Sequence, residues 1–143
     1  IRAAVEAAAH AGIPFVLNAR SDVFLHAIGP EETRLARIVE RLNAFAEAGA
    51  QSLFAPGITN RETIAKLVAA VRGPLNVLAT AGMPPLAELE TLGVARVSLG
   101  SGPMRATLGL LTRIARELRV QGSFSLMTEG AMPYPDANRL MRR

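Results

Sequence analysis

The feature that most constrains the fold of this chain is its regular alternation between short apolar segments and longer segments with helical periodicity. The apolar segments run over Phe15–Asp22, Gln51–Gly57, Leu75–Thr80 and Ala95–Gly100, and each ends in a polar residue or glycine. Between them, apolar residues recur three and four positions apart, as they do in helices that bury one face. Connections of this length join parallel strands. The sequence therefore predicts an α/β fold with a parallel sheet of four strands.

Glycine, proline and asparagine mark where the expected helices begin and end. These helices cover residues 3–11, Pro30 to Gly49, Asn60 to Gly73, a short stretch around Leu89 and a long stretch after the GSGP turn at residues 100–103. Four such strand–helix units fit either an open doubly wound sheet or half of an eight-stranded barrel. No GxGxxG motif follows the first strand, which argues against a dinucleotide-binding fold.

Composition excludes several classes of protein. The chain has 143 residues, half of them hydrophobic, which is enough for a globular core. It has no cysteine, so neither a disulfide framework nor a thiolate metal site can form. No apolar run reaches the roughly 18 residues that a membrane span needs, and the N-terminus lacks the anatomy of a signal peptide. We therefore expect a cytoplasmic protein with no membrane partner.

The net charge of +4 comes mainly from arginine. The arginines are spread along the expected helices and are interleaved with glutamate, for example at Arg34, Arg37 and Arg41, which is typical of a solvated helix face. A basic surface can also bind nucleic acid. Because no aromatic side chains are interleaved with these arginines, nucleic-acid binding is kept as a minor alternative and no nucleic-acid partner is expected.

The best candidate for a functional site lies at the end of the first predicted strand. Side chains alternate along a strand, so Asn18, Arg20 and Asp22 share one face. Arginine is almost never fully buried without a partner, and active sites form at the carboxyl ends of barrel strands. Arg20 would present a rigid fork of donors to a carboxylate or a phosphonate. The alternative interpretation is a purely structural pair between Arg20 and Asp22.

A second candidate is the glycine-rich turn Gly100–Arg105, which precedes the last long helix. Backbone amides at a helix N-terminus, here those of Gly100 and Ser101, can bind an anion. A Gly-Pro turn is also common before a helix that binds no ligand. His26 follows the first strand, where a loop could bring it to a site. No His, Asp or Glu residues have the spacing of a metal site, so no metal ligand is assigned.

Several motifs in one order resemble a known family. They are AHAGIPFVLNARSDVFL, RLNAFAEAGAQSLFAPGI, GPLNVLA, LGVARVSLGSGPMRA and PYPDANRLM. These stretches are similar to the isocitrate lyase and phosphoenolpyruvate mutase superfamily, in its carboxyphosphonoenolpyruvate mutase-like (oxaloacetate-decarboxylase-like) branch. The resemblance implies a (β/α)8 barrel of which this chain supplies strands five to eight. The expected half-barrel covers residues 1–121, followed by a C-terminal tail and short helix over residues 122–143.

The resemblance also implies a chemistry. Members of the family bind Mg²⁺ and a keto-acid or phosphonopyruvate-like substrate, and they make or break C–C or P–C bonds beside its carboxylate. Arg20 matches the family arginine on strand five that holds this carboxylate or phosphonate, so it is the predicted catalytic and substrate-binding residue. Asn18, Gly100 and Ser101 are further predicted substrate-binding residues. Phe54–Gly57 stands where the lyases place a glutamate after strand six, which favours the mutase-like branch.

The family's magnesium ligands and gating loop lie on earlier strands, which this sequence does not contain. Two main interpretations follow: a segment of a magnesium-dependent lyase or mutase, or a catalytically inactive remnant that acts only through oligomer assembly. Family members exchange their last helix, so we expect a homo-oligomer formed through the C-terminal helix. A half-barrel has two open sheet edges and an inner face, to which Val16, Leu53 and Val97 would contribute. We therefore expect the isolated chain to be neither a stable monomer nor active with magnesium.

Overall fold

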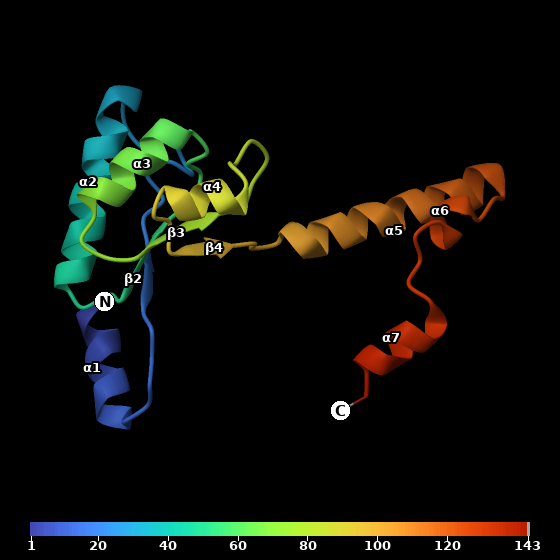
Figure 1. Ribbon diagram of the computed structural model, residues 1–143, viewed down its shortest axis with the longest axis horizontal. Coiled ribbons are helices and arrows are strands. Elements are labelled where there is room, and N and C mark those ends of the chain that lie inside the picture. Colours follow the sequence, from blue (N-terminus) through green and yellow to red (C-terminus); the bar gives the residue numbers. More distant parts are fainter. Residues whose placement is uncertain (143) are drawn as a thin grey trace. The chain divides into compact units, whose positions relative to one another are not determined.

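The computed structural model of the chain describes residues 1–142 and contains one parallel sheet (Figure 1). Its strands are β1 (Asn18–Arg20), β2 (Ser52–Ala55), β3 (Leu75–Leu78) and β4 (Arg96–Ser98). They pair in sequence order, and each neighbouring pair is parallel. The predicted α/β fold with four parallel strands is confirmed, although each strand is shorter than the apolar segment that predicted it.

Helices connect the strands and follow the last of them. Those of the first hundred residues are α1 (Arg2–Ala11), α2 (Glu31–Glu47), α3 (Arg61–Ala70) and α4 (Leu86–Thr91). After β4 come α5 (Gly102–Gln121), α6 (Ser125–Thr128) and α7 (Tyr134–Leu140). Within the described residues, none of these helices combines the length and the apolar character that crossing a membrane requires.

Local signals explain where several helices start and stop. Asn60 caps α3, because its side-chain oxygen accepts a hydrogen bond from the amide of Thr63 at 2.9 Å. Pro103 stands in the first turn of α5, where its missing N–H has no cost. Gly122 ends α5 in the left-handed conformation that glycine adopts without strain.

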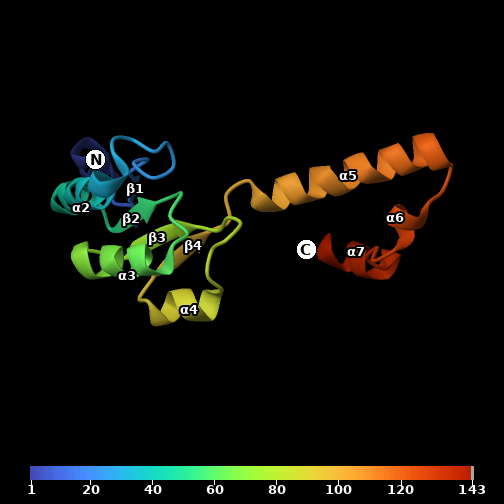
Figure 2. The same ribbon diagram turned by 90° about the horizontal axis from the view of Figure 1, so that it is seen from above.

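The core lies on one face of the sheet, which we call the covered face. Its buried side chains come from α2, α3, α4 and the two central strands: Ile38, Leu42, Leu53, Ala55, Ile64, Leu67, Leu75, Val77 and Leu89. Figure 2 shows α2, α3 and α4 in succession beside the strands. A doubly wound sheet reverses its strand order and carries helices on both faces. Sequential strands with their helices on one face are instead a segment of a barrel, as the resemblance predicted.

The other face of the sheet, which we call the open face, corrects one prediction. It carries Asn18, Arg20, Ser52, Phe54, Asn76, Leu78, Arg96 and Ser98, which the register places in phase with one another. Leu53 is fully buried on the covered face, and Val97 pairs with the buried Val77. The prediction that Leu53 and Val97 face the barrel interior is therefore wrong, because a shift of one residue moves a side chain to the opposite face. Polar residues fill much of the open face instead.

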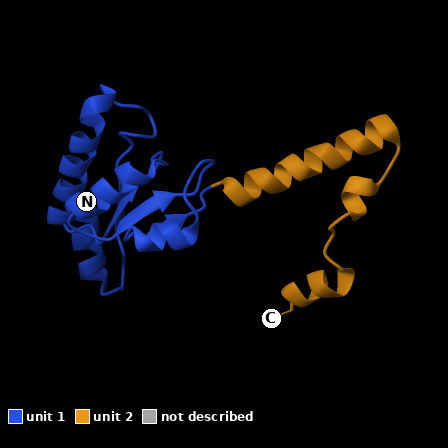
Figure 3. Cartoon of the chain, turned by 45° about the horizontal axis from the view of Figure 1, so that its top comes forward, with its two compact units in different colours: residues 1–100 blue, residues 101–143 orange. Residues whose placement is uncertain are grey.

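The chain divides into two compact units, residues 1–100 and residues 101–143, which Figure 3 colours separately. The first unit contains the sheet and α1 to α4, and the second contains α5, α6 and α7. By packing, α5 therefore groups with the tail, whereas the boundary predicted from the sequence lies after it, between residues 121 and 122. That α5 completes the half-barrel stays a prediction. The tail contains two short helices where one was expected.

Candidate functional site

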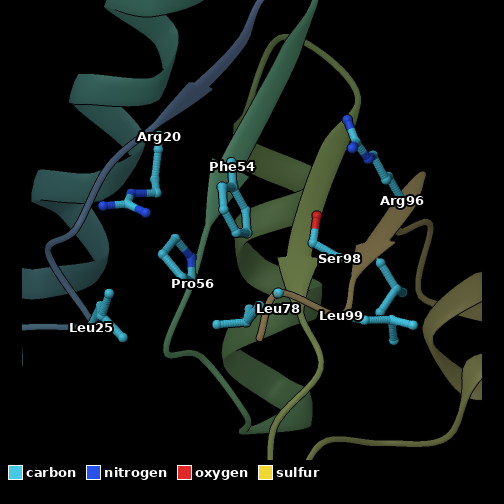
Figure 4. A pocket seen from close by; sticks show the side chains of 10 residues that line it. Arg20, Leu25, Phe54, Pro56, Leu78, Arg96, Ser98 and Leu99 are labelled. Atoms are coloured by element: carbon cyan, nitrogen blue, oxygen red, sulfur yellow. The ribbon is translucent and has the colours of Figure 1, made fainter. Parts of the chain in front are cut away.

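A hollow of about 540 Å³ lies on the open face toward the carboxyl ends of the strands (Figure 4). It is lined by residues of the four strands and of the segments that follow them: Arg20, Leu25, Phe54, Pro56, Leu78, Arg96, Val97, Ser98, Leu99 and Gly100. Parallel barrels build their active sites at this end, from residues of several strands. The hollow is therefore the candidate functional site of the first unit.

Arg20 is the last residue of β1 and borders the hollow. The register places it in one row with Phe54, Asn76 and Arg96, one residue from each strand. Its side chain is 53% exposed, so its guanidinium can be reached from solvent. Arg20 therefore lies on the face and at the strand end that side-chain alternation predicted.

Asp22 holds the guanidinium of Arg20 by two contacts. Arg20 Nη2 donates to Asp22 Oδ2 at 3.0 Å, and Arg20 Nε lies 2.9 Å from Asp22 Oδ1. The first contact is a hydrogen bond, and the second is a close ion pair without hydrogen-bond geometry. An exposed ion pair contributes only about 0–1 kcal/mol to stability. The structural pair that the sequence left open is thus present, but its contribution to the fold is small, and Arg20 still lines the hollow.

Two asparagine–serine pairs build the polar layer of the open face. Ser52 Oγ donates to Asn18 Oδ1 at 2.9 Å, which joins β1 to β2. Asn76 is fully buried, and its amide both donates to Ser98 Oγ at 3.0 Å and accepts from it at 3.1 Å, which joins β3 to β4. Asn18 shares the face of Arg20 but does not line the hollow. Its predicted contact with a substrate stays a prediction.

Arg96 and Ser98 are pocket residues that the sequence analysis did not single out. Both stand on β4 and line the hollow, with Arg96 on the edge strand opposite that of Arg20. The signal was present in the sequence, because Arg96 and Ser98 alternate with the apolar Val97 as Asn18 and Arg20 alternate with Ala19. Phe54, Pro56 and Leu78 add apolar side chains to the same wall.

The remaining candidates from the sequence divide between the two units. Gly100 lines the hollow in a left-handed conformation, with φ of 55°. Ser101 belongs to the second unit, where it occupies the N-cap position of α5 without a side-chain capping bond. His26 is exposed in the turn after β1 and is not part of the lining. Anion binding by the turn of Gly100 and Ser101 stays a prediction.

The residues of the hollow supply donors for an anion but no carboxylate or imidazole. Among residues 1–142, no three or more His, Cys, Asp or Glu side chains come together as a metal site. Asp22, the carboxylate next to Arg20, is already paired with it. The described residues therefore do not fit a magnesium site, and no step of the chemistry is assigned to that ion in this chain. What the hollow offers is two arginine residues, Arg20 and Arg96, beside an apolar wall.

Comparison with known sequences finds one matching family model and a partly similar protein. The family model described as phosphoenolpyruvate phosphomutase matches residues 1–119. An uncharacterized protein of Mycobacterium tuberculosis (strain H37Rv) is 36% identical over 78 residues, which are 54% of this chain and 30% of that protein.

Solved structures match nearly the whole chain. A protein of Burkholderia cenocepacia J2315 assigned as a lyase/mutase superposes with a TM-score of 0.88 at 41% identity, over 99% of this chain and 50% of that one. For 2,3-dimethylmalate lyase the TM-score is 0.73 at 27% identity, over 98% and 48% of the two chains. The structure of oxaloacetate acetylhydrolase with its product oxalate superposes with a TM-score of 0.73 at 25% identity, over 98% of this chain and 50% of that one.

The chain spans about half the length of these solved relatives. One of them is a lyase and another is an acetylhydrolase. The lyase is described as a member of the PEP mutase/isocitrate lyase superfamily. The family model matches most of the chain, the four parallel strands follow barrel order, and the solved relatives share the fold. The chain therefore belongs to the phosphoenolpyruvate phosphomutase family of that superfamily.

Proposed function

We propose that this chain carries the anion-binding side of a lyase or mutase that acts on a small keto acid or a phosphonopyruvate-like substrate. The observation that carries the proposal is Arg20, which lines the hollow at the carboxyl end of β1. A planar fork of donors suits the two oxygens of a carboxylate or phosphonate. In this role Arg20 binds and orients the substrate.

The relatives support a small, carboxylate-bearing substrate. One solved relative is 2,3-dimethylmalate lyase, another is oxaloacetate acetylhydrolase with its product oxalate, and the family model is described as phosphoenolpyruvate phosphomutase. The substrates in these names share a carboxylate on a short carbon chain. The apolar side chains of Phe54, Pro56 and Leu78 would face the carbon part of such a molecule while Arg20 holds its anionic end.

Magnesium is part of the proposed chemistry of the complete barrel, where it would stabilise negative charge that develops on the substrate. Because residues 1–142 bring together no set of metal ligands, we assign this chain a part in substrate binding only. We accordingly expect no magnesium-dependent turnover from this chain alone.

A second candidate function is assembly without catalysis. The observation that favours it is the apolar stripe of α5, whose side chains Met104, Leu108 and Leu111 are each 54% exposed. Exposed apolar surface of this extent is typical of association sites. A chain that retains this surface could act through oligomer formation alone, with α5 as the proposed contact between copies.

Equilibrium dialysis with radiolabelled oxalate tests the binding role of Arg20. We expect Arg20→Gln to weaken oxalate binding about tenfold or more, because a hydrogen-bonded charge contributes about 1.5–3 kcal/mol. Arg20→Lys should recover part of the affinity, since it keeps the charge and loses the fork. Arg113→Gln on α5 is the control for net charge. Oxalate binding that is equal in Arg20→Gln and the unaltered chain would leave the assembly interpretation as the better one.

A further inference from the structure

A second hollow lies beside the first and is lined mainly by arginine. We call it the arginine recess, and its lining is Arg20, Asp22, Val23, Ile28, Arg37 and Arg41. Its volume is about 290 Å³. Two of its arginines, Arg37 and Arg41, lie one helical turn apart on α2 and therefore project from the same side of that helix. We propose that the arginine recess is a binding site for a small oxyanion, separate from the hollow on the open face.

Charge is the first argument for this site. The recess brings three guanidinium groups together with the one carboxylate of Asp22, which gives its lining a formal charge of +2. Asp22 already pairs with Arg20. In the described part of the chain, neither Arg37 nor Arg41 forms an ion pair with a carboxylate. Guanidinium groups stay charged at any physiological pH, so this concentration of positive charge favours an anion.

Placement of the two free guanidinium groups is the second argument. Arg37 lies close against Gly29, since a side-chain carbon added at Gly29 would stand 2.8 Å from Arg37 Nη1. The guanidinium carbon of Arg41 lies 5.7 Å from the centre of the Phe45 ring, a distance typical of a cation–π contact. Arg41 is thus held by a neighbour, and Arg37 stands beside the turn at Gly29. An arginine that is already held loses less conformational entropy when it binds a ligand.

The walls of the recess are the third argument. Val23 is buried and Ile28 is half exposed, so the guanidinium groups stand next to apolar side chains. Charge interactions are stronger beside such groups than in bulk water. Several guanidinium groups around a small space match the oxygens of a phosphate group or a carboxylate, and Arg-rich sites are used for both. The lining includes no aromatic ring on which a large planar ligand could stack.

Arg20 links the arginine recess to the hollow on the open face, because it lines both. An oxyanion in the recess would face the same guanidinium that the proposed function assigns to the substrate. We therefore expect the two ligands to compete, so that an anion bound at Arg37 and Arg41 lowers the affinity of the hollow for oxalate.

Equilibrium dialysis with radiolabelled inorganic phosphate, at low ionic strength, tests the site in the full chain. The double variant Arg37→Gln/Arg41→Gln should bind phosphate at least tenfold more weakly than the unaltered chain. The matched control is Arg113→Gln/Arg142→Gln, which removes the same charge from exposed positions of the second unit and should leave phosphate binding unchanged. Equal losses in both double variants, or no loss in the first, would overturn the proposal.

Two further arms identify the ligand and separate the two sites. Oxalate replaces phosphate in the same dialysis, and the binding that Arg37→Gln/Arg41→Gln removes is compared for the two anions. A larger loss for phosphate assigns the recess to phosphate groups, and a larger loss for oxalate assigns it to carboxylates. In the recess double variant, oxalate binding that depends on Arg20 should persist, so failure of the recess and failure of the proposed function give different results. At equal ionic strength, unlabelled chloride should not displace the radiolabelled phosphate. If chloride displaced it as effectively as unlabelled phosphate does, the site would not be specific.

The unaltered chain provides a test that needs no folded variant. Phenylglyoxal modifies accessible arginine side chains, and mass spectrometry locates the modified residues. Phosphate should protect Arg37 and Arg41 and leave the modification of Arg113 unchanged. Equal modification of Arg37 and Arg41 with and without phosphate would overturn the proposal.

Discussion

Asn76 shows at the residue scale how the open face is held together. A fully buried amide without partners would be strongly unfavourable, yet Asn76 has no exposed surface in the middle of the sheet. Its two hydrogen bonds with Ser98, at 3.0 and 3.1 Å, satisfy one N–H and the oxygen of the amide and fix β4 next to β3. Because Ser98 lines the hollow, this pair also sets the position of part of its wall.

Removal of either partner should destabilise the first unit. We expect Asn76→Ala to lower the free energy of unfolding by about 1–3 kcal/mol, because it leaves the Ser98 hydroxyl without its partner. Urea denaturation followed by circular dichroism measures the change. The double variant Asn76→Ala/Ser98→Ala should lose less than the sum of the two single variants. Strictly additive losses would show that the two side chains are not coupled.

The sequence predicted the polar residue of the site on β1 but not those on β4. Arg20 was predictable because Asn18, Arg20 and Asp22 alternate over five residues and the family motif marks the same arginine. Arg96 and Ser98 repeat this alternation over only three residues, and the apolar Val97 between them suggested the opposite phase. The arginine recess could not be predicted, because whether Arg37 and Arg41 line one cavity with Arg20 depends on how α2 packs.

At the scale of elements, α5 and α6 are joined by a buried carboxylate. Glu117, in the last turns of α5, accepts hydrogen bonds from Ser123 Oγ at 2.6 Å and from the amides of Ser125 and Leu126 at 2.9 Å. The hydrogen bond from Ser123 lowers the pKa of Glu117, and the two amides lower it further, although burial acts in the opposite direction. The carboxylate therefore stabilises the first turn of α6 while it is ionised.

The lowered pKa of Glu117 predicts that the stability of the junction between α5 and α6 depends on pH. A carboxyl whose pKa is lower in the folded chain stabilises the fold above its unfolded value, about 4.3 for glutamate, and this contribution is lost as the pH falls through the folded value. Hydrogen exchange at the amides of Ser125 and Leu126 should therefore become less protected as the pH is lowered below that range, after correction for intrinsic exchange. Glu117→Gln should remove this pH dependence. Protection that falls equally in both chains would contradict the role of Glu117.

Element boundaries were predictable where a single residue determines them. Asn60 and Gly122 mark ends of α3 and α5 as the sequence indicated. The strands are shorter than their apolar segments, because a residue counts as strand only where a neighbour pairs with it, and β1 pairs with β2 over three residues. The division after Gly100 was not visible, since it depends on contacts between elements and not on local sequence.

At the scale of the whole molecule, each unit has surface that a complete fold would cover. β1 and β4 pair on one side only within the described residues, so both are edge strands. In the second unit, the stripe of Met104, Leu108 and Leu111 on α5 is more than half exposed. Unpaired edges and apolar stripes both favour association with other chains. The half-barrel predicted from the sequence thus leads to the expectation that this chain is not a stable monomer.

Light scattering coupled to size-exclusion chromatography tests that expectation. We expect a mass above that of one chain, and we expect Leu111→Glu to shift the mass toward one chain, because it places a charge within the apolar stripe of α5. Ala106→Glu adds the same charge at an exposed position on the opposite side of the helix and should leave the mass unchanged. An unaltered chain with the mass of a single chain and a sharp two-state melt would refute the expectation.

A crystal structure of the chain grown with oxalate tests the central claim most directly, since it shows what Arg20 binds. The account predicts oxalate in the hollow on the open face, with one carboxylate paired to the guanidinium of Arg20 and the molecule against the neighbouring side chains of Phe54 and Pro56. Oxalate bound elsewhere, with Arg20 still paired to Asp22 and the hollow filled by solvent alone, would contradict it.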